Sequence, residues 1–140
     1  MRFIITTAFL FAFPIMSHAA DITVTNTNNS GAGSLRQAIS DAVAGNEIDF
    51  SVSGTITLTT GEIALAKNLT ITGPAADQLT ISGNNYSRIF NVHAGAINIP
   101  GLTMTNGTGA GKDGGSMIIW SGQVTRHNTT FDNNDVIAHD

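Results

Sequence analysis

The residues best suited to chemistry in this sequence are six carboxylates between positions 49 and 135. Carboxylates clustered on adjacent chain segments bind calcium, and a nearby Arg or Lys can then act as a base on a polysaccharide. The six are Asp49, Glu62, Asp77, Asp113, Asp132 and Asp135. They are scattered along the chain, and no two suggest the facing pair that a glycosidase needs. The sequence therefore predicts no catalytic residue and no metal-binding residue.

Other residue types that carry chemistry are equally dispersed. His93, His127 and His139 have no cysteine partners, which argues against a zinc site. Residues 107–115 (GTGAGKDGG) lack the Lys-Ser/Thr ending of a phosphate-binding loop, so we expect a loop and predict no cofactor. Trp120 and Tyr86 are able to stack on sugars, but a single Trp in an apolar run favours a place in the core.

Composition narrows the function classes further. The chain has 140 residues, 6 Lys and Arg against 10 Asp and Glu, and no cysteine. A formal charge of −4 without a basic stripe argues against nucleic acid as a partner. Without disulfides, stability must come from packing and backbone hydrogen bonds.

Residues 1–19 are typical of a secretory signal peptide. Arg2 precedes an apolar run, and Ser17-His18-Ala19 places small residues where a signal peptidase tests them. The run is shorter than a membrane-spanning helix and contains Pro14, so we expect export and no transmembrane helix after cleavage.

Residues 20–46 are expected to form an N-terminal cap made of one strand and one helix. Residues 22–25 alternate as a strand, and a helix is predicted over 34–44. Ser34 and Gln37 form a capping box, in which Ser34 accepts from the Gln37 N–H and the Gln37 side chain reaches back. Gly45-Asn46 is expected to end the helix.

From residue 47 to residue 140 the apolar pattern alternates with a period of two, in strands of three to five residues. One series of similar triplets begins at Ile56, Leu79, Leu102 and Val124, and a second begins at Ile48, Leu69 and Phe90. Steps of 21–23 residues are typical of a stacked repeat. We predict a right-handed parallel β-helix of about four coils, the last one incomplete; the alternative is a β-sandwich with hairpins.

The repeat also predicts which residues stack. Ile56, Leu79, Leu102 and Val124 should form a buried file, and Thr57, Thr80, Thr103 and Thr125 an exposed ladder. Arg126 would then fall in the inward file of Leu58, Ile81 and Met104. A buried guanidinium is costly, so we expect the last coil to be frayed or Arg126 to lie at an open end.

Several segments resemble bacterial exported right-handed parallel β-helix proteins, and the resemblance covers nearly all of residues 20–140. The segments are 22–28, 31–39, 68–74, 79–84, 101–107 and 129–134. Residues 114–118 (GGSMI) with 131–134 (FDNN) are similar to the GGA-I and F-x-x-N repeats of polymorphic outer membrane proteins. The resemblance implies a capped solenoid at the cell surface or secreted, usually several hundred residues long, so we expect this chain to be a piece of one.

Two functions follow from these expectations. The favoured one is a secreted or cell-surface scaffold without enzymatic activity, of the adhesion or passenger type. The alternative is a piece of a carbohydrate-active β-helix enzyme, a polysaccharide lyase or glycosidase, that lacks its active coils. The expected partners are a surface polysaccharide or a host or neighbouring-cell surface protein, and the open C-terminal coil offers a strand edge for self-association.

Overall fold

A computed structural model describes residues 20–109 and 115–135 of the chain. The signal peptide expected at 1–19 lies outside these residues, as do Asp113 and His139. The described part contains one helix, α1 (Leu35–Asp41), and twelve short strands. The strands are β1 (Ile22–Val24), β2 (Glu47–Phe50), β3 (Gly54–Thr57), β4 (Ile63–Leu65), β5 (Leu69–Ile71), β6 (Leu79–Ser82), β7 (Phe90–Val92), β8 (Ala96–Pro100), β9 (Thr103–Thr105), β10 (Met117–Ile119), β11 (Gln123–His127) and β12 (Thr130–Asp132).

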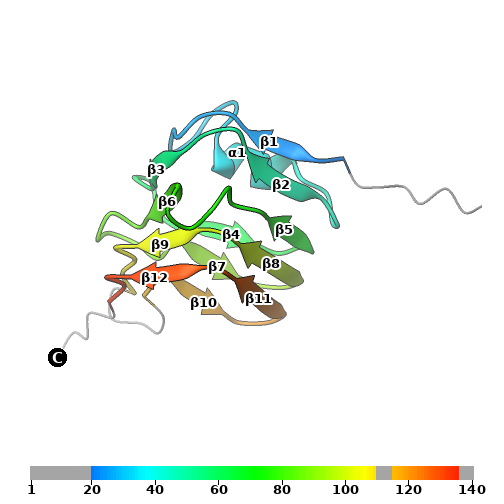
Figure 1. Ribbon diagram of the computed structural model, residues 1–140. Coiled ribbons are helices and arrows are strands. Elements are labelled where there is room, and N and C mark those ends of the chain that lie inside the picture. Colours follow the sequence, from blue (N-terminus) through cyan, green and yellow to red (C-terminus); the bar gives the residue numbers. More distant parts are fainter. Residues whose placement is uncertain (1–19, 110–114, 136–140) are drawn as a thin grey trace, which may run out of the picture.

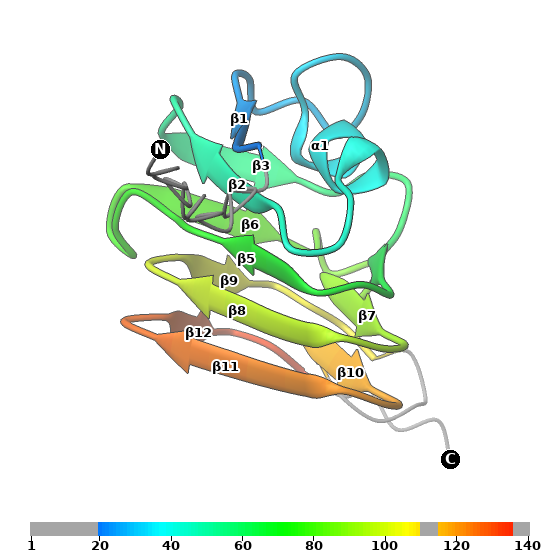
Figure 2. The same cartoon turned by 90° about the vertical axis from the view of Figure 1, so that its right-hand side faces the viewer.

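The strands form three parallel sheets that wind around one core. Their orders are β1-β2-β5-β8-β11, β3-β6-β9-β12 and β4-β7-β10. Successive coils lie one below another in Figure 1, and Figure 2 shows the first sheet running down the molecule. Because the chain visits the three sheets in turn and every strand pair is parallel, the parallel β-helix is confirmed and the hairpin-built sandwich is excluded.

The N-terminal cap begins as expected but its helix is shorter. Ser34 is the N-cap and its Oγ accepts from the Gln37 N–H at 3.2 Å, whereas α1 ends at Asp41 rather than at residue 44. The reciprocal half of the capping box is wrong. The Ser34 N–H donates instead to the Gly31 carbonyl (3.1 Å), and the Gln37 side chain donates to Asp41 Oδ1 (2.7 Å).

The end of α1 has a local cause. Asn46 Oδ1 accepts from the Val43 N–H at 2.7 Å, which holds the chain in a turn before Gly45. Gly45 has a φ of 91°, a conformation that favours glycine. The apolar side of α1, formed by Leu35, Ala38 and Ile39, remains buried and covers the first end of the core.

The predicted stacking of the first series is confirmed between β6 and β9, where Thr80 pairs with Thr103, and is wrong by two residues between β3 and β6. Ile56 pairs with Ile81, Ile81 with Met104, and Met104 with Phe131, whereas Leu79 pairs with Gly54. The outward-facing ladder is accordingly Thr55, Thr80, Thr103 and Thr130, of which Thr80 and Thr103 are half-buried. The steps along the buried file are 81 − 56 = 25, 104 − 81 = 23 and 131 − 104 = 27 residues, because the turns between strands differ in length. A shift of two residues leaves the same side chains inside.

The second series is right in part, because β2 and β5 are neighbours in one sheet, but their register differs from that of the series by two residues and Phe90 belongs to another sheet. Ile48 of β2 pairs with Ile71 of β5, while Phe90 lies in β7 between Ile63 and Met117. Val124 likewise belongs to β11, where it pairs with Ile97 and not with a residue of β9. The triplets are alike because the strands of all three sheets have the same alternation of apolar inward and polar outward side chains.

Glycines allow successive turns to stack closely. Gly95 and Gly122 occupy the turns from β7 to β8 and from β10 to β11, with φ values of 95° and 93°. A Cβ on Gly122 would lie 2.3 Å from the Gly95 carbonyl oxygen. These turns therefore hold the ends of β7 and β10 in register.

The free energy of unfolding of two alanine variants tests whether the file that contains Ile81 is buried. Ile81 is fully buried, whereas Ile119 in the last coil is 49% exposed. We expect Ile81→Ala to lower the free energy of unfolding by about 2–5 kcal/mol and Ile119→Ala to lower it by less than about 1 kcal/mol, measured by urea denaturation. Equal losses in the two variants would contradict the buried file.

Candidate functional site

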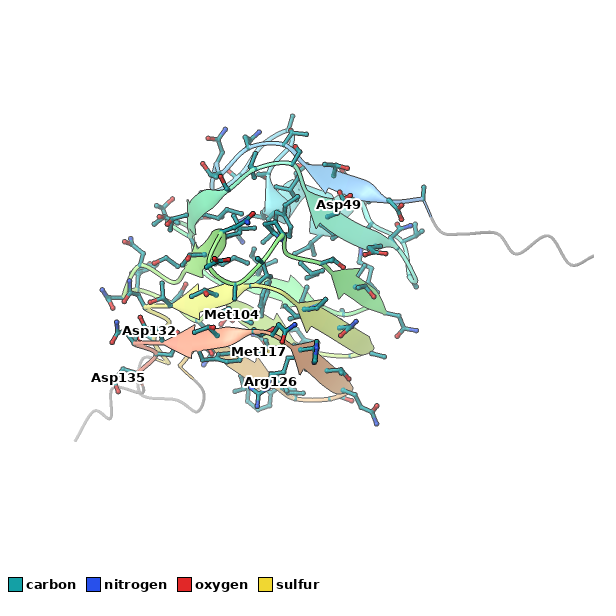
Figure 3. The ribbon with its side chains drawn as sticks, viewed as in Figure 1. Asp49, Met104, Met117, Arg126, Asp132 and Asp135 are labelled. Carbon is teal, nitrogen blue, oxygen red and sulfur yellow. The ribbon has the colours of Figure 1, made fainter. Side chains whose placement is uncertain are left out.

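The acidic residues singled out from the sequence do not come together. Asp49 lies on β2 beside β1, whereas Asp132 on β12 and Asp135 lie at the opposite end of the solenoid (Figure 3). Within residues 20–109 and 115–135 there is no group of three or more His, Cys, Asp or Glu side chains able to hold a metal ion. The described coils therefore lack the carboxylate cluster that calcium-dependent polysaccharide chemistry requires.

The two described histidines are also apart. His93 follows β7, and His127 ends β11, which belongs to another sheet; both side chains are exposed. Asp77 is exposed in the turn before β6, a strand of the remaining sheet, so it too comes from a separate part of the solenoid.

The last coil leaves the solenoid core open. A cavity of about 290 Å³ lies there, lined by residues that include Met104, Met117, Ile119, Val124 and Phe131. The labelled Met104, Met117 and Arg126 lie at this end in Figure 3 and come from β9, β10 and β11, one strand of each sheet. Inward-facing side chains are exposed here because no further strand covers β10, β11 and β12 within the described residues.

Arg126 takes a place different from the one predicted. It lies on β11 and pairs with Ile99, not in the file of Ile81 and Met104. Its side chain is exposed at the open end, with its guanidinium carbon 4.9 Å from the centre of the Phe131 ring. Because the guanidinium is exposed and lies over an aromatic ring, it avoids the free-energy cost of burying a charge. This agrees with the prediction that Arg126 lies at an open end.

A polar cluster that the sequence analysis missed lies at the start of the sheet β4-β7-β10. Arg88 Nε donates to Glu62 Oε2 at 2.8 Å, and Asn91 Nδ2 donates to Glu62 Oε1 at 2.6 Å. The Arg88 side chain is 13% exposed and that of Glu62 29%. The residues are 26 and 29 positions apart in sequence. The Ile63–Phe90 pairing, a step of 27, brings them together.

Arg36 connects this cluster to the cap. From α1, its guanidinium donates to the carbonyl oxygens of Gly61 (2.6 Å) and Glu62 (3.0 Å). Partial burial lowers the pKa of Arg36, which remains charged because a guanidinium ionises far above neutral pH. The helix is thus tied to the turn that enters β4.

The environment of Glu62 favours its ionised form. Burial by itself raises the pKa of this carboxyl group, but hydrogen bonds from Arg88 and Asn91, together with the positive charges of Arg88 and His93, outweigh it. The pKa of Glu62 therefore lies below its ordinary value.

A groove opens beside this cluster, and two aromatic side chains lie in the turns that flank the same sheet. The groove, of about 290 Å³, lies between α1 and β4 and is lined by residues that include Arg36, Ala66 and Lys67. Trp120 is 66% exposed in the turn after β10, so its predicted place in the core is wrong. Tyr86 is 67% exposed in the turn before β7. Trp120 stays outside because the alternation that turns Ile119 inward turns its neighbour outward.

Comparison with known proteins gives relatives of one kind. The chain is 38% identical over 92 residues to a probable pectate lyase C of Aspergillus flavus, covering 64% of this chain and 21% of the relative. It is 36% identical over 92 residues to a probable pectate lyase C of Aspergillus fumigatus, with the same coverage. For Emericella nidulans the identity is 32% over 106 residues, or 74% of this chain and 24% of the relative.

The chain thus spans less than a quarter of the length of these curated relatives. No family model and no solved structure matches it. None of these three relatives is a bacterial outer membrane protein, so the resemblance to polymorphic outer membrane repeats remains a prediction. In the part of the chain that the structure describes, no helix is long and apolar enough to cross a membrane. The chain is a parallel β-helix similar in sequence to part of these probable pectate lyases.

The Glu62 cluster makes stability depend on pH. We expect Glu62→Gln to lower the free energy of unfolding at neutral pH by about 1–2 kcal/mol, since it removes a charged acceptor of two hydrogen bonds. The folded-state pKa is lowered, so this stabilisation is complete above the unfolded value of about 4.3 and is lost as the pH falls through the folded value.

Urea denaturation at neutral and at acidic pH measures this effect. The difference between the wild-type protein and Glu62→Gln should close on acidification. Asp77→Asn, which changes an exposed turn carboxylate, serves as the matched control and should differ little from the wild type at either pH. A difference that persists unchanged in acid would contradict an ionised Glu62.

Proposed function

We propose that this chain forms coils of an exported parallel β-helix that acts on an acidic polysaccharide of the pectate type. The similarity to probable pectate lyases, at 38% identity over 92 residues, supports the proposal most directly. The fold agrees with it, because a parallel β-helix presents long regular outer faces on which an extended polymer can lie. Of the two functions derived from the sequence, the carbohydrate-active alternative is therefore preferred over the adhesion module.

Within such a protein we assign the described coils to binding rather than to bond cleavage. They carry no metal-capable cluster of acidic side chains among residues 20–109 and 115–135. They do carry Arg36 and Lys67, which line the groove beside β4. Cationic side chains beside a groove suit a polymer with one carboxylate on each sugar.

The expected domain organisation becomes part of the proposal. Residues 1–19 would direct export, residues 20–46 would cap the solenoid, and the coils from residue 47 would meet the polysaccharide. An exported protein reaches a polymer that lies outside the cell, which is consistent with the signal-like start.

Binding to defined polysaccharides tests the proposed function. The purified secreted chain should be retarded by polygalacturonate in affinity electrophoresis and not by neutral dextran, and added salt should weaken the retardation. Formation of unsaturated uronides is followed in the same samples. A chain that neither binds nor cleaves polygalacturonate would contradict the proposal.

A further inference from the structure

The outer face of the sheet β4-β7-β10 carries a straight row of three exposed residues from successive coils. Leu65 pairs with Val92, and Val92 with Ile119. The next residues continue this register, since the His93 N–H donates to the Leu65 carbonyl (2.8 Å) and the Trp120 N–H to that of Val92 (2.9 Å). Ala66, His93 and Trp120 are thus neighbours, and all three are exposed. With about 4.8 Å between strands, the row is about 10 Å long.

Basic side chains gather at the first end of this row. Ala66 and Lys67 line the groove beside Arg36, and Arg88 lies at the start of the same sheet. The charge of Arg88 is offset by its ion pair with Glu62 (2.8 Å), so the positive charge at this end of the row comes chiefly from Arg36 and Lys67. Arg36 and Lys67 hydrogen-bond to backbone carbonyl oxygens, of Gly61 and Ala42 among others, which leaves their formal charges in place.

The two ends of the row offer different chemistry. Trp120 presents an exposed ring that suits the apolar face of a sugar, and the Lys67 end attracts anions. His93 lies between them and is exposed, so it can donate or accept a hydrogen bond. A ligand that fits all three must combine flat apolar faces, hydroxyl groups and repeated negative charge.

We infer that the row of Ala66, His93 and Trp120 on the outer face of the sheet β4-β7-β10, together with Lys67 in the groove at its first end, binds uronate units of the polysaccharide. One sugar ring stacks on Trp120, and a carboxylate nearer the groove is held by Lys67. The inference rests on the proposed function and deepens it, because it assigns binding to one face of the solenoid. Single-stranded nucleic acid also combines stacking with negative charge, so it belongs in the test.

Matched variants test the assignment by titration calorimetry with oligogalacturonate. Trp120→Ala should weaken binding about tenfold, the loss expected for one stacking platform. Lys67→Gln should weaken binding and reduce its salt dependence. Tyr86→Ala removes an equally exposed aromatic side chain from the turn that enters β7 and should change affinity less than about twofold. Circular dichroism and urea denaturation establish that each variant is folded.

The outcomes separate the two proposals. If the wild-type chain binds oligogalacturonate and both Trp120→Ala and Lys67→Gln bind as tightly, the row is not the binding site although the proposed function stands. If the wild-type chain does not bind, the site and the function both fail. If single-stranded DNA binds as tightly as oligogalacturonate and competes with it, the uronate assignment is wrong.

Discussion

Each coil of this protein depends on its neighbours to bury its inward side chains. A single coil of three short strands has no second layer of its own, so its aliphatic residues are covered only by the coils above and below. Ile56, Ile81 and Met104 are fully buried in one such file, whereas Phe131 at its end is 37% exposed. Stacking along the axis is the constraint on which the rest of the structure depends.

The two ends of the solenoid meet this constraint differently. At the first end, β1 pairs with β2 and the apolar side of α1 covers the core, so Val24 and Leu35 are fully buried. Arg36 then ties α1 to the turn before β4. At the other end, the last described strands leave inward residues around a cavity of about 290 Å³.

The same stacking organises the outer surface. A parallel register brings residues about one coil apart into contact, which places Arg88 and Asn91 against Glu62. It also sets His93 and Trp120 side by side on the sheet whose first strand borders the groove lined by Arg36 and Lys67. Binding surface and core therefore arise from one repeat, and the described coils acquire a polar face without the carboxylate cluster of a metal-dependent enzyme.

From the sequence alone, the near-constant step between similar triplets predicted the parallel β-helix, the alternation of apolar residues predicted the inward side of most strands, and the capping box placed Ser34 at the start of α1. The repeat predicted the register correctly between β6 and β9, where Thr80 pairs with Thr103, but not between the other strands of the first series. Turns of unequal length give steps of 25, 23 and 27 residues, and a two-residue shift leaves the inward pattern unchanged. The Glu62 cluster and the exposed place of Trp120 follow from that register, so only the tertiary structure decided them. The physical reason is that alternation reports which face a side chain takes, whereas pairing depends on how the turns pack.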